Sequence, residues 1–596
     1  MRRITLLLIC GYLGAAAYVP AQDDVVMKAM RDELDRSLKQ LRLQNLDKPY
    51  FIAYRVSEQT RYNIAASLGS LTGNQQSRAR LLSVEVRVGD YALDDTNFLS
   101  PRFGPAGVVR GFGNTVQLPL EDDYKEIRRQ IWLATDAAYK KALEALAQKR
   151  AALENKTRSD DLPDLSKEEP TTSFESPASL NMDPGRAEDL VRQLSALLRS
   201  MPEIHRCDVA IEASSGYIRY LNSEGTEYTR AAPYVGLIAR TATQAPDGMP
   251  LSDSLAVYGH SMNALPAQDQ LAAQLQEMGR RLVELRSAPL VERYNGPVLF
   301  EGQASAEIFS QEFAPKLIAS RHPITGEPQF EMFFSRTASP LQDRLGARVL
   351  PAWASVTDDP TAREAKEVAL VGGYAVDDDG VRARRTVVVE NGVLKTLLVS
   401  RDPVRGIPRS TGNVRGFGVA PSNLFFNVQG GLTDAALRQK LLSLAQQRGE
   451  PYAIVVRRLR NPWLGNPTEM AGVVLGQFLP GLGGGSSSAG DSAVLAYEVF
   501  PDGREKLVRN ARFEGIDASS FKDLVAASAG QTVYSTPFLD FKGMVVGLLS
   551  GGALPAESDP PIVSLVVPDL LFEDVSVVPP SGEVPKPPLS QPPSGR

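Results

Sequence analysis

Cysteine and histidine are scarce in this 596-residue chain, which has only two Cys and three His. Cys10 lies in an apolar N-terminal run, so Cys207 is the single cysteine elsewhere and no disulfide can form within a chain that loses that run. The surrounding letters, HRCDVAIEA, are typical of a strand and predict a buried structural thiol. A zinc site needs three or four converging ligands, and His205 with Cys207 supplies two. The sequence therefore predicts no metal site built from Cys and His.

A basic charge excess and the common hydrolase and phosphate motifs are also absent. The chain has 65 Lys and Arg against 70 Asp and Glu, a net charge of -5, whereas nucleic-acid-binding surfaces are basic. The Gly/Ser run 481–490 lacks the Lys-Ser/Thr ending of a phosphate loop, and no G-x-S-x-G elbow occurs. The acidic runs 358–359 and 377–380 lack the spaced oxygens of a calcium loop and are interpreted as loop turns. We therefore expect no nucleic-acid partner.

The N-terminus has the features of an export signal. Arg2 and Arg3 precede an apolar run, and Val19-Pro20-Ala21 supplies the small residues that signal peptidases accept. Ile9, before Cys10, is too large for the usual lipid-attachment motif. No later run reaches the roughly 18 apolar residues that a spanning helix needs. We expect cleavage after Ala21, export to the periplasm or the medium, and no transmembrane segment.

The remaining chain is too long for one compact core and divides by its hydrophobic periodicity. Steps of three and four predict helices over 25–43, 121–153 and 267–287, and Asp183-Pro184 marks the start of another. Alternation predicts a strand at 82–88, and further strands reach about 243, with a hairpin across 222–225. The polar stretch 154–180 is predicted to be an exposed loop that leaves the domain surface.

After residue 288 the pattern changes to strands. Asn391-Gly392 and Pro501-Asp502-Gly503 predict two hairpins, and one capped helix is expected over 433–449. We therefore predict an α+β protein with a mixed sheet-and-helix N-terminal domain and a β-rich C-terminal domain. The expected divisions are a signal peptide at 1–21, the N-terminal domain at 22–265, a bridging helix at 266–287, the C-terminal domain at 288–578 and a disordered Pro-rich tail at 579–596.

The stretch GPVLFEGQASAEIFSQEFAP at 296–315 raises a question of chemistry. A buried-looking strand runs into a Gly-Gln break and then a helix, with Glu301 and Glu307 close to the start of the helix. Many hydrolases hold a metal or a catalytic carboxylate at such a corner. No His or Cys lies in the stretch, so the residues alone do not distinguish an altered active site from a structural corner.

The block 343–430 contains, in this order, the stretches VDDDGVRARRTVVVENGVLKTLL, STGNVRGFG and APSNLFF. With these motifs it resembles the C-terminal half of the TldD/PmbA family of metallopeptidases. Looser matches in the N-terminal half are YNIAASLGS, SVEVRVGDY and GVVRGFGN. The resemblance covers most of 24–578 and rests on the order of its motifs rather than on any single one.

Active members of that family hold a metal through a helix motif, His-Glu-x-x-x-His, with a Cys from a later strand. The resemblance places Phe300 and Ser305 at the two His, Glu301 at the Glu and Ala493 at the Cys. Phe and Ala have no ligand atom, and Ser is a poor zinc ligand. A carboxylate without a metal cannot bring the pKa of water near neutrality. We therefore expect no metal cofactor, although the family uses zinc, and expect Glu301 to cap the following helix.

The family includes a degenerate, PmbA-like class that pairs with an intact TldD-like chain. The resemblance thus implies a non-catalytic, peptide-binding subunit of an exported metallopeptidase complex, with peptide pairing along the strand 422–427. Its expected peptide contacts are Asn413, Arg415, Ser422 and Asn423. Two alternatives stay open: an active peptidase with a rearranged site using Glu301 and His322, and a stand-alone envelope binding protein.

The mature chain should begin at Gln22, because the small residues at positions 19 and 21 follow a charged and apolar leader. N-terminal sequencing of the protein isolated from its native host checks this. An intact Met1, or a lipid attached to Cys10, would contradict it.

Overall fold

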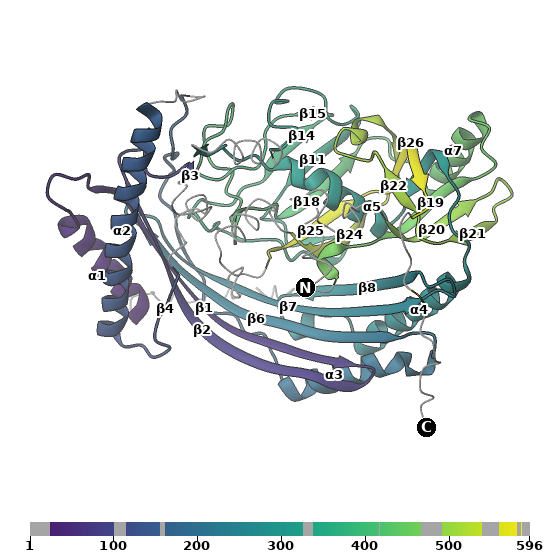
Figure 1. Ribbon diagram of the computed structural model, residues 1–596, viewed down its shortest axis with the longest axis horizontal. Coiled ribbons are helices and arrows are strands. Elements are labelled where there is room, and N and C mark those ends of the chain that lie inside the picture. The colour runs from purple at the N-terminus through teal and green to yellow at the C-terminus, as the bar shows by residue number, and fades with distance from the viewer. Residues whose placement is uncertain are drawn as a thin grey trace, which may run out of the picture.

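The computed structural model describes residues 24–99, 115–154, 161–325, 338–416, 418–465, 492–538, 560–580 and Lys586. The expected signal peptide, the Gly/Ser run 481–490 and nearly all of the expected tail lie outside these residues. Figure 1 shows two halves: a long, curved N-terminal sheet with helices packed on it, and the smaller C-terminal sheets stacked above it. Within the described ranges, no helix has the length and apolar character needed to cross a membrane.

The N-terminal sheet has seven strands in the order β4-β2-β1-β6-β7-β5, with β8 also paired to β7. The predicted hairpin at 222–225 is confirmed, because β6 and β7 pair antiparallel across it. The predicted strand at 82–88 is the end of the much longer β2. The strands are β1 (Pro49–Ser67), β2 (Ser70–Val88), β4 (Val116–Gln117), β5 (Thr172–Phe174), β6 (Arg206–Asn222), β7 (Glu227–Gln244) and β8 (Pro250–Gly259).

The four predicted N-terminal helices are confirmed. Asp24 caps the first through its carboxylate, which accepts the N–H groups of Val26 and Met27 at 2.9 and 3.0 Å. Asp183 caps the third, with Pro184 in its first turn. Such caps satisfy backbone donors that a helix start leaves without partners. The helices are α1 (Val25–Gln40), α2 (Tyr124–Glu154), α3 (Pro184–Ala196) and α4 (Gln268–Ser287).

The two faces of the N-terminal sheet have different partners. Side chains alternate between the faces of a strand, so Ile52 and Ile64 of β1 share one face, where Ile52 packs with α1 and α2 and Ile64 with α3 and α4. Phe51 points to the other face and clusters with Val376 of the C-terminal half. The helix expected to bridge the domains, α4, packs with Leu282 in the same core as α3, β6 and β7.

Part of the stretch expected to be an exposed excursion is buried. Asp164, Leu165 and Ser166 are at most 4% exposed, and β5 joins the sheet. The carboxylate of Asp164 accepts a hydrogen bond from the Lys149 ammonium at 2.5 Å and from the Arg321 guanidinium at 3.1 Å. The prediction of exposure for this part is wrong, because polar side chains become buried where distant partners compensate their charge.

The C-terminal half contains two six-strand paths, β15-β14-β11-β18-β25-β24 and β21-β20-β19-β9-β26-β22, with β23 beside β26. Both predicted hairpins are confirmed, as β14–β15 and β20–β21. The strands are β9 (Tyr294–Phe300), β11 (Ala354–Asp358), β14 (Thr386–Glu390), β15 (Val393–Leu394), β18 (Asn423–Val428), β19 (Ala453–Leu459), β20 (Ala493–Val499), β21 (Glu505–Val508), β22 (Arg512–Glu514), β23 (Leu524–Ala527), β24 (Thr532–Pro537), β25 (Ile562–Val567) and β26 (Leu570–Val578).

Short elements complete this half. The predicted helix at 433–449 is α7 (Asp434–Gln447), capped by the Thr433 hydroxyl. α5 (Gln303–Ile308) continues directly into a π-helical turn (Phe309–Phe313) and a 3-10 turn (Ala314–Leu317). Three two-strand pairs are β3 (Phe98–Leu99) with β10 (Ile324–Thr325), β12 (Glu364–Ala365) with β13 (Val368–Ala369), and β16 (Val414–Arg415) with β17 (Gly418–Val419).

Buried pairs of arginine and carboxylate join the two halves. Arg401 of the C-terminal half binds both oxygens of Glu224, in the β6–β7 turn, at 2.7 and 2.8 Å. Arg55 and Arg230 of the N-terminal sheet bind Asp378. The acidic run 377–380 is therefore a turn, as predicted, but it is a buried one that fixes the interface. Removing one member of such a pair leaves an uncompensated buried charge.

Gly380 should tolerate no side chain at this interface. Its φ is +81°, and a Cβ atom there would lie 2.7 Å from the Thr226 methyl carbon and 3.0 Å from the Tyr220 ring. Gly380→Ala should lower the free energy of unfolding by about 2–4 kcal/mol, combining left-handed strain with overpacking. Gly449→Ala is the matched control, because its φ is +78° and its Cβ would meet open space. Equal losses in urea unfolding would show that the contact with Thr226 does not matter.

Candidate functional site

The strand–helix corner anticipated at 296–315 is present. β9 ends at Phe300, and the chain turns at Gly302, whose φ of +58° favours glycine, into α5. The Glu301 N–H donates to the Val456 carbonyl of β19 at 2.9 Å, and the Gly302 N–H donates to the Asp569 carboxylate at 2.7 Å. The corner is thus held from both sides by neighbouring strands.

The residues placed at the metal-ligand positions are all buried. Phe300 is fully buried, with ring centroids 5.4 Å from Phe513 and 5.5 Å from Phe572. The Ser305 hydroxyl donates to the Pro568 carbonyl, and Ala493 begins β20. Phe300 ends a strand whereas Ser305 lies in α5, so these two positions do not lie on one helix as the family motif requires. The extended run before Glu301 explains this, because it continues β9 to residue 300.

The π-helical turn after α5 offers a different register for the motif. The two His of His-Glu-x-x-x-His are five residues apart, which on an α-helix separates their directions by about 140°. A π-helix instead bonds residue i to residue i+5 and brings such a pair close to one face. Across the turn Phe309–Phe313, the positions with that spacing are Phe309, Ser310 and Ala314, the last of which begins the 3-10 turn. This register could not be predicted from the residues, because a π-helical turn gives no recognised sequence signal.

Both registers lead into one set of aromatic rings, which we call the phenylalanine cluster. Phe300 contacts Phe572, Phe572 contacts Phe521, and Phe521 contacts Phe309, with centroid distances of 5.3–6.2 Å. The other members are Phe313, Phe426 and Phe513. All seven are buried in the same hydrophobic core. The cluster offers no atom that could bind a metal ion.

We expected Glu301 to cap α5, but among the described residues no side chain caps this helix, and Glu301 instead belongs to an ionic network. Its two carboxylate oxygens accept from Arg438 at 2.8 and 2.9 Å, and Arg457 adds a third contact at 3.2 Å. Glu505 closes the network by accepting from both arginines, at 3.0 and 2.7 Å. Burial raises the pKa of Glu505, but the two arginines outweigh it and lower that pKa overall. Both oxygens of Glu301 are thus engaged by guanidinium groups, and His322 is not part of this network.

Glu307, on α5, has no charged partner in direct contact. Its carboxylate accepts the Leu459 N–H at 2.6 Å and the Gln303 amide at 2.7 Å. Burial raises the pKa of Glu307 to about 7, although the charge of Arg458 acts to lower it. Arg458 instead pairs with Asp253 of β8 at 3.2 Å, so this group lies where β8 meets the C-terminal half. No three His, Cys, Asp or Glu side chains in the described residues are grouped to hold a metal ion.

Three of the four expected peptide contacts are buried and serve the fold. The Ser422 N–H and hydroxyl both donate to Asp358, at 2.7 and 2.9 Å, and the Asn413 amide donates to the same carboxylate at 2.7 Å. The Asn423 amide donates to the carbonyls of Asp359 and Ala362. Burial raises the pKa of Asp358 to about 6 despite these bonds. This network joins the end of β11 to the start of β18.

The strand expected to bind peptide is not an edge. β18 pairs with β11 on one side and with β25 on the other, so its backbone groups are already used in the sheet. The prediction of pairing along 422–427 is therefore wrong. Arg415 is half-buried, and it donates to the carbonyls of Pro421 and Ile562 while lying over the Tyr374 ring.

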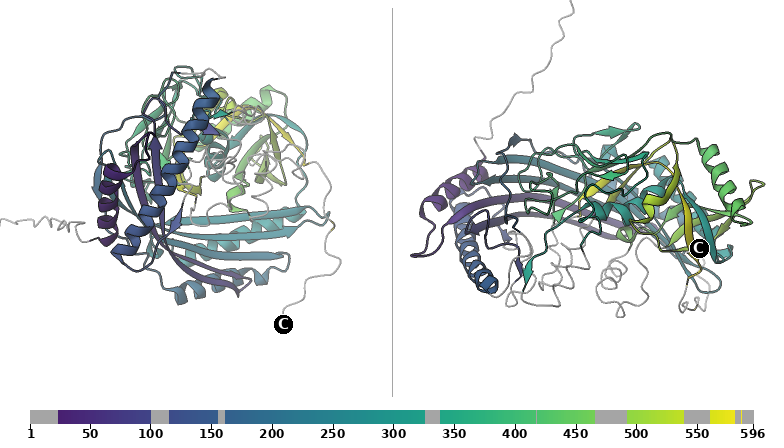
Figure 2. Two further views of the ribbon diagram at one scale, coloured as in Figure 1. Left: turned by 60° about the vertical axis from the view of Figure 1, so that its left-hand side comes forward. Right: turned by 90° about the horizontal axis from the view of Figure 1, so that it is seen from above.

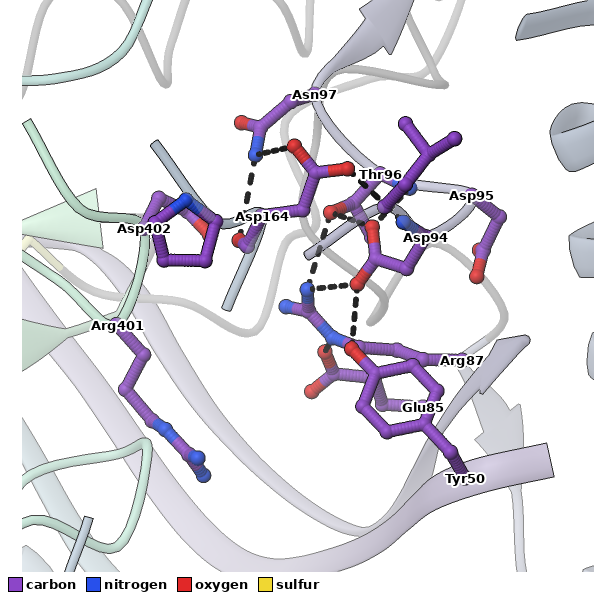
Figure 3. Close-up of polar contacts among 12 residues, drawn as sticks. Tyr50, Glu85, Arg87, Asp94, Asp95, Thr96, Asn97, Asp164, Arg401 and Asp402 are labelled. Atoms are coloured by element: carbon purple, nitrogen blue, oxygen red, sulfur yellow. Dashed lines mark hydrogen bonds and ion pairs between the residues drawn. The ribbon is translucent and has the colours of Figure 1, made fainter. Parts of the chain in front are cut away.

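A second buried charged group lies in the N-terminal half (Figure 3). The Arg87 guanidinium contacts Glu85 at 2.6 Å and Asp94 at 2.9 Å, and the Tyr50 hydroxyl also donates to Asp94, at 2.7 Å. Burial and the neighbouring Asp94 raise the pKa of Asp95 to about 8. The contacts satisfy Arg87 internally, which indicates a structural role for this group. Cys207 is a buried strand thiol, as predicted, and burial raises its pKa to about 12.

Comparison with known proteins identifies the C-terminal half. Residues 293–446 match the family described as the PmbA/TldA metallopeptidase C-terminal domain. A Methanocaldococcus jannaschii metalloprotease is 42% identical over 82 residues, which cover 14% of this chain and 17% of that protein. The match thus spans less than a fifth of the length of that relative.

Two crystal structures share the fold of nearly the whole chain. One is a Thermotoga maritima protein described as a candidate modulator of a DNA gyrase, with 14% identity, a TM-score of 0.57 and coverage of 92% of this chain and 100% of that chain. The other is TldE from Thermococcus kodakarensis, with 13% identity, a TM-score of 0.54 and the same coverage. These likenesses show a shared α+β fold over nearly the whole chain. Residues 293–446 form a domain of the PmbA/TldA metallopeptidase type, so the C-terminal half resembles that of TldD/PmbA proteins.

Glu307 should make stability depend on pH. Its pKa is about 7 in the folded chain and about 4.3 in an unfolded one, so the folded state binds the proton more tightly. Its contribution is fully present below about pH 4.3 and is lost as pH rises to about 7. Glu307→Gln removes this loss. As pH rises from about 4.3 to about 7, the free energy of unfolding of the variant, measured in urea, should therefore increase relative to that of the parent by a few kcal/mol. The exposed Glu292→Gln is the control, and parallel curves for Glu307→Gln and the parent would contradict the assignment.

Proposed function

We propose that this chain is the non-catalytic, peptide-binding subunit of an exported TldD/PmbA-type metallopeptidase complex. The observation that carries the proposal is the phenylalanine cluster. In the register first considered, Phe300 occupies the first His position, and in the π-turn register Phe309 does. A phenylalanine ring has no lone pair for a metal, and both rings are fully buried.

The other positions support the same conclusion. Ser305 uses its hydroxyl on the Pro568 carbonyl, and Ala314 has no ligand atom. The retained acid, Glu301, pairs with two arginines, so both of its oxygens accept guanidinium N–H groups. Hydrolysis by a metalloenzyme needs an open coordination position and a metal-bound water. We propose that an intact TldD-like sibling chain supplies both, a pairing consistent with the likeness to TldE.

The proposed peptide site must lie away from β18, since that strand is enclosed. Extended peptides bind by adding to the outer strand of a sheet, where backbone groups lack partners. Asn413, Ser422 and Asn423 then act by holding β11 and β18 together, and Arg415 stays the one expected contact that is only half-buried. An active peptidase is the second candidate, favoured by Glu307, whose pKa of about 7 is the value that acid–base catalysis at neutral pH requires.

The purified chain should bind no stoichiometric zinc, because neither register of the motif supplies an imidazole or a thiolate. Elemental analysis after extensive dialysis in zinc-containing buffer checks this, with an intact family member as the positive control. A content of about one zinc per chain would contradict the proposal that the metal-ligand positions of this chain carry no ligands.

Glu301→Gln should separate a structural from a catalytic role. If Glu301 only joins Arg438 and Arg457, the change should cost about 1 kcal/mol of stability and leave peptide cleavage by the reconstituted pair unchanged. The matched variant is Glu505→Gln, which weakens the same network from its other side. A loss of about 10²–10⁴-fold in cleavage by Glu301→Gln alone, with normal folding and pairing, would show a catalytic base.

Affinity purification from the envelope, followed by mass spectrometry, tests the partnership. The expected companion is a family member with an intact His-Glu-x-x-x-His motif. Recovery of this chain alone under several detergents and salt concentrations would instead favour the stand-alone binding protein.

A further inference from the structure

Exposed apolar side chains are concentrated at one end of the N-terminal half. Of the eight large hydrophobic side chains classed as exposed among the described residues, six belong to α1, α2 and the segments beside them, at 40–53% exposure. They are Leu38, Leu43, Leu46, Leu120, Trp132 and Leu133. Scattered single exposed leucines are ordinary, but a group that includes a tryptophan marks a contact surface.

The two helices form one outer surface. Figures 1 and 2 show α1 and α2 side by side at the end of the long sheet that is far from α7. The Arg36 guanidinium lies 5.8 Å from the Trp132 ring centroid, and the Leu43 N–H donates to the Tyr139 hydroxyl at 3.3 Å. The last turn of α1 therefore lies beside Trp132, and the segment 41–48 lies beside Tyr139, about two turns further along α2. We call residues 36–48 with residues 132–141 the α1–α2 face.

The charge of the α1–α2 face is opposite to that of the chain. Residues 36–48 and 132–141 hold six Lys and Arg against two Asp, whereas the whole chain has a net charge of -5. One of the two Asp, Asp136, pairs with Lys140 at 2.6 Å. Exposed basic residues at or beside the apolar side chains are Lys39, Arg42, Lys48, Lys140 and Lys141.

We propose that the α1–α2 face docks on an anionic lipid surface. Leu43, Leu46 and Trp132 would enter the headgroup region, where tryptophan and leucine partition well, and the basic residues would lie near lipid phosphates. The abundance of lysine favours a membrane over a protein partner, because lysine is depleted at the centres of protein interfaces. The opposite faces of α1 and α2 stay packed on the sheet, so docking requires no unfolding. This inference is independent of the proposed subunit role.

Vesicle binding by the full mature chain tests the proposal. The protein is mixed with vesicles of phosphatidylcholine alone or of phosphatidylcholine with phosphatidylglycerol, and bound protein is measured by sedimentation. We expect binding to the anionic vesicles, little to the neutral ones, and weakening as salt is raised. Tryptophan emission should shift to the blue on binding, and Trp132→Phe should abolish the shift, because Trp353 and Trp463 are half-buried elsewhere.

Paired substitutions locate the contact. Trp132→Ser with Leu133→Ser should weaken vesicle binding at least about tenfold, as should Lys39→Glu with Lys48→Glu. The matched control is Leu290→Ser with Val368→Ser, which removes the other two large hydrophobic side chains exposed in the described part of the chain and should leave binding unchanged. Because all these positions are exposed, the variants should fold, which urea unfolding confirms.

Three results would overturn the proposal: no sedimentation of the parent with either vesicle, equal binding by the Trp132 and Leu133 double variant, or equal binding to neutral and anionic vesicles. If a purified sibling chain covers Trp132 and vesicles do not, the face belongs to a protein interface instead. Failure of vesicle binding would leave zinc content and partner recovery, and hence the subunit role, untouched.

Discussion

The phenylalanine cluster is the constraint on which the C-terminal half depends. Its seven rings come from β9, the π-helical turn, β18, β22, β26 and the segment before β23, so one core joins both C-terminal sheets. A metal centre needs polar donors and access for water, whereas packed rings stabilise a fold by excluding water. The same volume cannot serve both purposes. If the proposed subunit role holds, phenylalanine at the ligand positions fills with a packed core the space that a metal site would need.

The position of this core relative to the N-terminal sheet is fixed by buried ion pairs. Arg401 with Glu224, Arg230 with Asp378, and Arg458 with Asp253 each join one half to the other. Such pairs add little net stability, since desolvation offsets their attraction, but a wrong arrangement would leave charges buried without partners. They therefore favour one relative placement of the halves.

The sequence predicted correctly the helix starts and turns that adjacent residues determine. It did not predict the features that depend on contacts between distant segments. Asp183-Pro184 and Asn391-Gly392 marked a helix start and a hairpin correctly, because caps and tight turns depend on adjacent residues. The strand 422–427 was mistaken for an edge, because β25, which covers it, lies about 140 residues later. Asp164 was expected in solvent, because its partners Lys149 and Arg321 come from other elements. The π-helical turn Phe309–Phe313 was not predicted for a similar reason, because packing against other segments determines where such a turn forms.

The two glutamates of the β9–α5 corner show why the candidate site could not be judged from its own residues. Glu301 and Glu307 are six residues apart, yet one meets two arginines and the other meets only N–H donors in a buried setting. A general base must keep a lone pair directed at the water it activates. Arg438 and Arg457 occupy both oxygens of Glu301, and Leu459 and Gln303 occupy those of Glu307. Partners from α5, α7 and β19 thus hold both carboxylates in contacts that join strands and helices, and none of these partners can be recognised from the stretch 296–315 alone.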